Sequence, residues 1–139
     1  MKLFTTYLTL TTKGSTDVID ITDRVQAQLE NYNLKEGQIV LFVPGSTGGL
    51  TTMEFEPNLV KDIKNAFENI VPKNIDYAHH MTWGDHNGHS HIRASLLGSS
   101  LTVPFKEKKL ILGAWQQIVF IDFDTSRRNR ELVLQIIGS

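Results

Sequence analysis

The sequence contains no cysteine, which excludes disulfide bonds, thiolate catalysis and any zinc site with cysteine ligands. It has no apolar run long enough to cross a bilayer, and its first twelve residues are too polar for a signal peptide, so we expect a cytoplasmic protein. The 14 basic and 15 acidic residues nearly cancel, which leaves no overall field to attract nucleic acid or an anionic membrane. Small molecules or protein partners are therefore the expected ligands.

Histidine is confined to one short stretch, residues 77–91 (YAHHMTWGDHNGHSH). The five histidines are His79, His80, His86, His89 and His91, and Asp85 and Asn87 lie among them. Imidazole and carboxylate groups bind Zn²⁺ and similar divalent cations, and imidazole also transfers protons near neutral pH. The stretch therefore predicts a metal site or an acid–base site.

The hydrophobic pattern predicts a single domain over residues 1–139. Alternating or continuous apolar patterns predict strands at residues 2–12, 38–43, 50–56, 75–83, 101–105, 110–112, 115–123 and 132–137. Helical spacing predicts helices at residues 22–33, 58–70 and 88–97, with Asn58 capping the second. Residues 124–130 (DTSRRNR) are interpreted as a basic hairpin connection between two strands.

The spacing of the histidines leaves their ligand set open. In an extended segment His79 and His80 point to opposite faces, so we do not expect His80 to belong to the same ligand shell as His79. If residues 88–97 are helical, His89 and His91 diverge by about 200°. They point the same way only if the segment is extended. We expect His79 and His91 to converge on a shared cavity that accepts a cation, and we interpret His86 as an exposed loop residue.

Two further segments carry groups that suit a phosphate. Residues 44–57 (PGSTGGLTTMEFEP) combine glycines with hydroxyl residues, which is typical either of a loop that cradles an anion or of a tight connection between strands. Residues 127–130 hold three arginines, which either bind phosphate or keep a loop soluble, and the second reading is favoured. Glu54 is expected on a strand face, where it has a function only if that face adjoins the histidines.

Four segments together resemble a known family. They are residues 87–100 (NGHSHIRASLLGSS), 101–105 (LTVPF), 112–124 (LGAWQQIVFIDFD) and 131–138 (ELVLQIIG). The signature matches at Ser100, Val103, Gly113, Trp115, Gln116 and Ile118 and departs at Phe105, Lys108 and Ala114. The chain resembles the YjbQ-like proteins, also described as the secondary thiamine-phosphate synthase family.

The resemblance implies an α+β fold, a two-sheet β-sandwich-like domain with two to three helices, which assembles as a homotrimer. It also implies a histidine pocket for a divalent metal, zinc, and weak thiamine-phosphate synthase activity that joins hydroxymethylpyrimidine diphosphate to thiazole phosphate. Many relatives carry a histidine where this chain has Gly45, so any role of that histidine is absent here or is supplied by His80.

These considerations give a working assignment of site residues. The expected metal ligands are His79, His89 and His91, with Asp85 as an alternative to His89. The expected catalytic residues are Glu54, Asp85 and Asn87, and those expected to bind a small phosphorylated molecule are Ser46, Thr47 and Arg93. Whether the protein is an enzyme stays open, because a trimer that binds a metal or a phosphorylated ligand without turnover fits the same residues.

Overall fold

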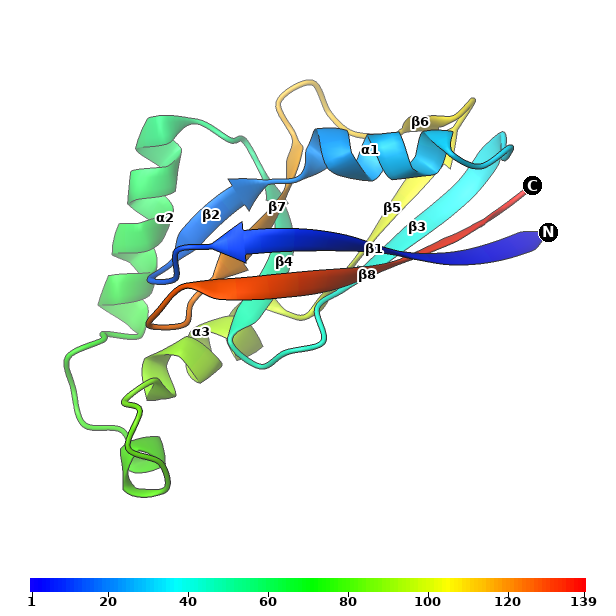
Figure 1. Ribbon diagram of the computed structural model, residues 1–139. Helices are drawn as coiled ribbons and strands as arrows, with labels where there is room; N and C mark the ends of the chain where they lie inside the picture. The colour runs from blue at the N-terminus through cyan, green and yellow to red at the C-terminus, as the bar shows by residue number, and fades with distance from the viewer.

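The computed structural model describes all 139 residues and has two antiparallel β-sheets, three α-helices and one short 3-10 helix (Figure 1). Along the chain the elements are β1 (Lys2–Thr12), β2 (Asp17–Asp20), α1 (Thr22–Glu30), β3 (Glu36–Phe42), β4 (Gly48–Met53), α2 (Pro57–Ile70), η1 (Ala78–Met81), α3 (Gly88–Leu97), β5 (Ser100–Lys106), β6 (Lys109–Leu110), β7 (Gln117–Asp122) and β8 (Arg128–Gly138). The expected two-sheet α+β fold is confirmed. No helix has the length and apolar character needed to cross a membrane.

The larger sheet has five strands in the order β1-β8-β3-β5-β6. β1 and β8 pair along their whole length, from Lys2 opposite Gly138 to Thr12 opposite Arg128. Side chains alternate between the two faces of a strand, and in both strands the even-numbered residues, such as Leu10 and Leu132, face the core. The odd-numbered residues of β1 and β8 lie on the outer face of this sheet.

The smaller sheet has the order β2-β7-β4 and forms the middle layer of the molecule. On one face, Ile118 and Phe120 of β7 join the main core of 17 buried residues, which also includes residues of the larger sheet and α1. On the other face, Val119 and Ile121 pack against Ala94 of α3, and Phe67 of α2 adjoins the same cluster. Because β7 is covered on both sides, it lies between the main core and the helices that lead to the histidines.

The cap of α2 differs from the expectation. Asn58 is not the N-cap. The carboxylate of Glu56 accepts hydrogen bonds from the backbone N–H groups of Asn58 and Leu59 at 2.9 and 2.8 Å, and Pro57 occupies the first helical position. A proline fits there because the first helical N–H has no partner inside the helix. These amide hydrogen bonds also lower the pKa of Glu56.

Two other expectations about local structure were wrong, and one strand was missed. Residues 75–83 do not form a strand but hold η1, because the segment packs against the helix α3 and pairs with no strand. β2 was not anticipated, although it pairs with β7 over four residues. Residues 124–130 are not a hairpin connection, because β7 and β8 belong to different sheets and the chain crosses between them, with β8 already begun at Arg128.

Candidate functional site

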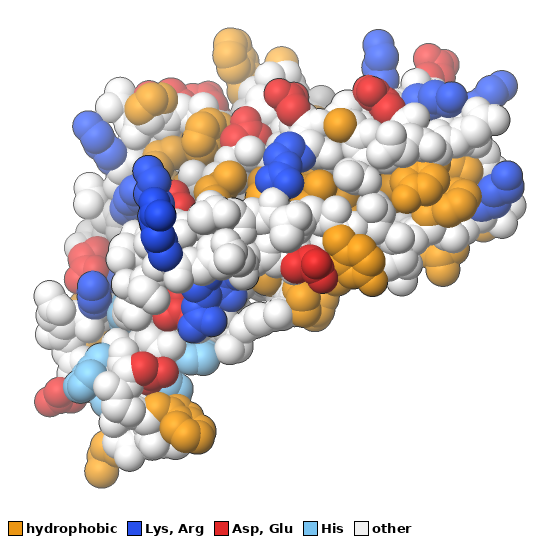
Figure 2. Space-filling model, viewed as in Figure 1, with side chains coloured by type: hydrophobic (Ala, Val, Ile, Leu, Met, Phe, Trp, Pro, Cys, Tyr) orange, Lys and Arg blue, Asp and Glu red, His pale blue; other side chains and the backbone are white.

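The histidines lie on a projection at one end of the molecule. Residues 71–87, between α2 and α3, extend beyond the two sheets at the lower left of Figure 1. The histidine side chains gather at the base of this projection, next to arginine and aspartate side chains (Figure 2). The sequence cluster is therefore also a cluster in space, at the opposite end of the molecule from the two chain termini.

His79 and His91 meet there, as expected. Their ring centroids are 4.6 Å apart, and both rings line a cavity of about 400 Å³, which we call the His79–His91 cavity. The other lining residues are Pro44, Gly45, Ser46, Thr47, Trp83, Asp85, Asn87, Arg128 and Arg130. The glycine-hydroxyl loop, the histidine stretch and the arginine segment, which are far apart in the sequence, thus border one space.

Gly88 allows the two histidines to approach each other. It opens α3, and a Cβ at this position would lie 2.8 Å from the Cβ of Tyr77 and 3.4 Å from that of His79. A glycine therefore lets η1 pack directly on the first turn of α3, which brings His79 to His91. The sequence pattern GHSH thus combines a close-packing residue with a cavity residue.

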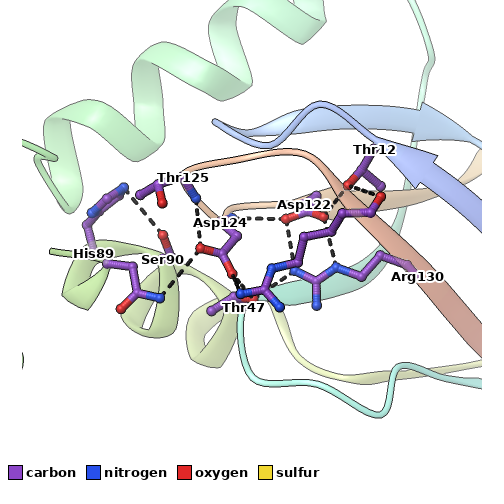
Figure 3. Close-up of polar contacts among 10 residues, drawn as sticks. Thr12, Thr47, His89, Ser90, Asp122, Asp124, Thr125 and Arg130 are labelled. Atoms are coloured by element: carbon purple, nitrogen blue, oxygen red, sulfur yellow. Dashed lines mark hydrogen bonds and ion pairs between the residues drawn. The ribbon is translucent and has the colours of Figure 1, made fainter. Parts of the chain in front are cut away.

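The strands contribute a wall of paired charges (Figure 3). Arg130 donates from Nε and Nη2 to the two carboxylate oxygens of Asp122 at 2.8 and 2.9 Å, and Thr12 also donates to that carboxylate. Asp122 is fully buried. Burial would raise the pKa of Asp122, but the hydrogen bonds from Arg130, Thr12 and the backbone N–H of Asp124 outweigh it and lower the pKa. The carboxylate is therefore ionised and fixed.

Asp124 continues this wall toward the histidines. It accepts from the Thr47 hydroxyl at 3.1 Å, from Arg128 at 2.6 Å and, at 3.5 Å, from the amide of Asn87. Burial would raise its pKa, but the Thr125 amide, Thr47, Arg128 and Asn87 together lower it. Thr47 in turn accepts from Nη2 of Arg130 at 2.7 Å, so the carboxylates and arginines form one connected network.

The opposite wall has polar atoms without partners. Four buried side-chain atoms in the chain make no hydrogen bond: Nδ1 of His79, Nε2 of His80, Oδ1 of Asn87 and Nδ1 of His89. All four belong to the histidine stretch, and two of them, on His79 and Asn87, come from residues that line the His79–His91 cavity. Buried polar groups are nearly always paired, so this concentration of unpaired atoms sets the histidine stretch apart from the rest of the chain.

The three-histidine metal site is not assembled within one chain. No three His, Asp or Glu side chains lie close enough together to hold one ion. His79 and His91 supply two nitrogen donors, whereas His89 is not among the residues that line their cavity. His89 is buried, and its Nε2 lies 3.4 Å from the Ser90 hydroxyl. The residues of one chain therefore fit a two-nitrogen site rather than a closed structural zinc site.

The environment of His89 opposes its protonation. Burial, followed by the positive charge of Arg93, lowers its pKa from the ordinary 6.5 to about 4. The imidazole is therefore neutral at physiological pH.

Arg93 and Glu54 lie outside the cavity. The guanidinium of Arg93 donates to the Val71 carbonyl, Thr16 and Glu68, so its donors bind the end of α2. Glu54 is exposed just after β4 and does not line the cavity. Of the other expected residues, Ser46, Thr47, Asp85 and Asn87 do line it.

Asp122 and Asp124 were not among the predicted site residues, and Arg128 and Arg130 were considered only as part of a segment that either binds phosphate or keeps a loop soluble. The sequence carries one signal for the aspartates, since FIDFD places two acidic residues at the end of an otherwise apolar strand, where a buried charge requires a partner. The partner follows within eight residues, across a connection between sheets that the sequence does not reveal.

The comparison with protein families settles the relationship. Residues 6–139 match the family described as UPF0047 protein YjbQ-like. This chain belongs to the YjbQ-like family. An Archaeoglobus fulgidus UPF0047 protein is 38% identical over 126 residues, which is 91% of this chain and 96% of the relative. The Bacillus subtilis UPF0047 protein YugU is 31% identical over 132 residues, 94% of this chain and 97% of the relative.

Solved structures of the YjbQ-like family share the fold. A Sulfolobus solfataricus protein, described as YbjQ-like and of unknown function, has a TM-score of 0.92 at 29% identity, with 99% of both chains covered. An uncharacterized conserved protein of the family from Clostridium acetobutylicum has a TM-score of 0.87 at 35% identity, with 95% of this chain and 99% of the other covered. The family resemblance seen in the sequence is therefore confirmed, together with the fold.

Proposed function

We propose that the His79–His91 cavity binds a small phosphorylated molecule and a divalent cation, and that the chain is a transferase resembling thiamine-phosphate synthases. The observation that carries the binding proposal is the contrast between the two walls. One wall is a hydrogen-bonded array of arginines and aspartates, and the facing wall holds unpartnered polar atoms of His79 and Asn87. These atoms are closed to solvent, so a ligand in the cavity would pair with them through a local rearrangement of the histidine stretch.

The arginines favour an anionic ligand. Nε and Nη2 of Arg130 bind Asp122 and Thr47, but Nη1 takes part in none of these bonds. That nitrogen lies only 3.1 Å from the position of a Cβ on Gly45, so the glycine leaves room beside it. Arg128 is half-exposed at the same cavity. Guanidinium groups bind phosphate oxygens through charge-assisted hydrogen bonds, and the cavity has the size of a small-molecule site.

The histidines favour a cation as well. We place a divalent cation, zinc, at His79 and His91, with solvent, ligand oxygen or another subunit completing its coordination. Such a cation would neutralise the charge of a diphosphate as it leaves. The protein's own groups would hold the ligand, with Arg128, Arg130 and Ser46 on the phosphate side and Asp85 and Asn87 orienting the other end.

In the proposed reaction, the nitrogen of thiazole phosphate forms a bond to the methylene carbon of hydroxymethylpyrimidine diphosphate, whose bond to the diphosphate oxygen breaks. The diphosphate leaves with the bonding electron pair. The role of Arg130 is then to stabilise the negative charge that develops on that oxygen, a common source of catalysis at such sites. Glu54 can take part only if another subunit brings it to the cavity.

One observation favours binding without turnover as the second candidate. The aspartates of the strand wall are both paired with arginines and have lowered pKa values, so neither is free to act as a general base. Proton transfer would depend on Asp85 and the histidines. Measuring condensation of the two thiamine precursors by the purified protein separates the candidates, since ligand binding with no product would leave the binding role alone.

We also propose that the chain forms the homotrimer implied by its family resemblance. Exposed apolar side chains on the outer face of the larger sheet, Leu3, Tyr7 and Phe42, support an assembled form, because such residues are commonly covered by a partner. Sedimentation velocity of the full chain tests this, and a monomer at micromolar concentration would contradict it.

Calorimetric titration with inorganic pyrophosphate, with and without Zn²⁺, tests the site. Arg128→Gln should weaken pyrophosphate binding about 10-fold or more, the effect of losing one charge-assisted hydrogen bond. His91→Gln should remove the increase in affinity that Zn²⁺ produces. Arg127→Gln is the matched control, because Arg127 is an exposed neighbour that does not line the cavity. Equal losses in Arg127→Gln and Arg128→Gln would show that pyrophosphate binds only through general charge.

A further inference from the structure

The projection contains a second cavity, on a different set of residues. It has a volume of about 390 Å³ and is lined by Lys73, Asn74, Ile75, Asp76, His80 and His86. The ring centroids of His80 and His86 are 4.7 Å apart, nearly the same separation as in the first pair. None of its lining residues borders the His79–His91 cavity.

The two cavities divide the histidine stretch between them. The odd-numbered residues His79, Trp83, Asp85, Asn87 and His91 line the first cavity, and the even-numbered His80 and His86 line the second. Because His79 and His80 are consecutive in η1, one turn of 3-10 helix presents an imidazole to each cavity. The sequence pattern predicted that His80 would face away from His79, and this is confirmed, but the partner His86 was interpreted only as an exposed residue.

His80 lines the second cavity and has a ring nitrogen without a hydrogen-bond partner. Its Nε2 is buried and makes no hydrogen bond, and its ring packs edge-on against Tyr77, with centroids 5.6 Å apart. Tyr77 is itself held by a hydrogen bond from its hydroxyl to the Pro72 carbonyl. The imidazole is therefore oriented by packing, while its lone pair or N–H has no partner in the chain. A bound ion would remove the cost of leaving that nitrogen unpaired.

His86 is held in an uncommon backbone conformation. Its φ is +52°, in the left-handed region that residues other than glycine seldom adopt. Such a conformation costs free energy, and residues kept in it concentrate at functional sites. Here it accompanies the approach of the His86 ring to that of His80.

We infer that His80 and His86 form a second cation site, separate from the proposed ligand cavity, which takes a late first-row divalent ion. The lining offers two imidazoles as electron-pair donors, with no third His, Asp or Glu side chain close enough to share an ion with them, and the Asp76 carboxylate offsets the charge of the Lys73 ammonium. That balance favours a cation over a phosphate. With two imidazole donors and open positions for solvent, affinity should follow the order in which Cu²⁺ exceeds Zn²⁺.

Titration with Cu²⁺ tests this inference in a chain without a histidine tag, with binding followed by calorimetry and by nitrogen splitting in the electron paramagnetic resonance spectrum. The parent is His91→Gln, in which the first histidine pair is broken, so the result does not depend on the proposed function. This parent should still bind one Cu²⁺ per chain. Adding His80→Gln or His86→Asn should weaken Cu²⁺ binding at least about 10-fold, since losing even an outer partner of a metal ligand has that effect.

The variants remove one imidazole at a time and leave the backbone of the projection unchanged. Asparagine tolerates a positive φ, so His86→Asn removes the imidazole without straining the loop. Adding His79→Gln to the same parent is the matched control, because His79 is adjacent in η1 but lines the other cavity, and Cu²⁺ affinity should not change. Unchanged affinity in His86→Asn, or loss of binding in the His79→Gln control, would overturn the second site.

Discussion

The two walls of the His79–His91 cavity differ in how far the protein satisfies its own polar groups. On the strand wall, both oxygens of Asp122 and the hydroxyl of Thr47 have hydrogen-bond partners within the chain. On the helix wall, Nδ1 of His79 and Oδ1 of Asn87 have none. The first wall therefore contributes to folding, whereas the second leaves binding capacity unused. The strand wall thus holds the cavity in shape while presenting Arg128 and Arg130 to it, whereas the wall formed by His79 and Asn87 has polar atoms that nothing in the chain satisfies.

The largest effect is expected from breaking the strand wall. Asp122→Ala leaves the buried guanidinium of Arg130 without its carboxylate, and removing one partner of a buried ion pair typically costs about 3–5 kcal/mol. Urea denaturation measures the loss in the free energy of unfolding. Glu68→Gln is the control, since Glu68 also pairs with a buried arginine but is itself 52% exposed, and it should cost no more than about 1 kcal/mol. Similar losses in the two variants would show that the buried Asp122–Arg130 pair contributes no more stability than the partly exposed Glu68–Arg93 pair.

A smaller effect is expected from pH, through His89 on the helix side. The unfolded chain takes up a proton on His89 below about 6.5, but the folded chain does so only below about 4, so stability falls as the pH drops through this interval. A shift of this size amounts to about 2 kcal/mol lost between pH 7.5 and pH 5. Asp122 and Asp124, whose pKa values are lowered, retain their contribution throughout that range and lose it only at more acidic pH.

Urea denaturation at the two pH values checks this, with His89→Gln expected to lose about 2 kcal/mol less than the wild type on acidification. His86→Asn serves as the control, since His86 is exposed and its replacement should leave the His89 contribution unchanged. A wild-type stability that is flat from pH 7.5 to pH 5 would contradict the assignment.

The smallest effect on stability is expected at the wall of the cavity formed by His79 and Asn87. His79→Phe removes a nitrogen that has no hydrogen-bond partner, so the free energy of unfolding should change by less than about 1 kcal/mol. Thr47→Val, at the facing wall, removes a hydroxyl that joins Arg130 to Asp124 and should cost about 1–3 kcal/mol. Thermal or urea unfolding compares the two. If His79→Phe proves the more damaging, then His79 is part of the scaffold and not of the unused binding capacity.

The periodic part of the fold was predictable from local sequence. The alternation of residues 2–12 and the helical spacing of residues 88–97 gave both elements their observed bounds. Burial of alternate residues explains the pattern in β1, whereas in α3 the apolar Ile92 and Leu96 are exposed. The same reasoning failed at residues 75–83, where alternation occurs without a neighbouring strand edge. A pattern of side chains does not specify the pairing that a strand requires.

The site was predictable only in part, because its geometry depends on contacts between distant segments. The meeting of His79 and His91 was expected and is confirmed, whereas His89, only two residues away, lies apart. The helix beginning at Gly88 separates them, as one of the two conformations considered for that segment requires. The pairing of Arg130 with Asp122 joins two sheets, and nothing local in the sequence indicates it.

Arg130 belongs to β8, whose inner face runs directly from the cavity into Leu132, Leu134 and Ile136 of the main core. Amide hydrogen exchange in this part of the strand should accordingly require opening of much of the molecule, whereas residues 71–87, outside both sheets, can exchange through local fluctuations. The cavity thus lies between a segment expected to exchange slowly and one expected to exchange fast. Binding of a ligand that contacts both segments should therefore slow amide exchange mainly in residues 71–87, because β8 is already protected.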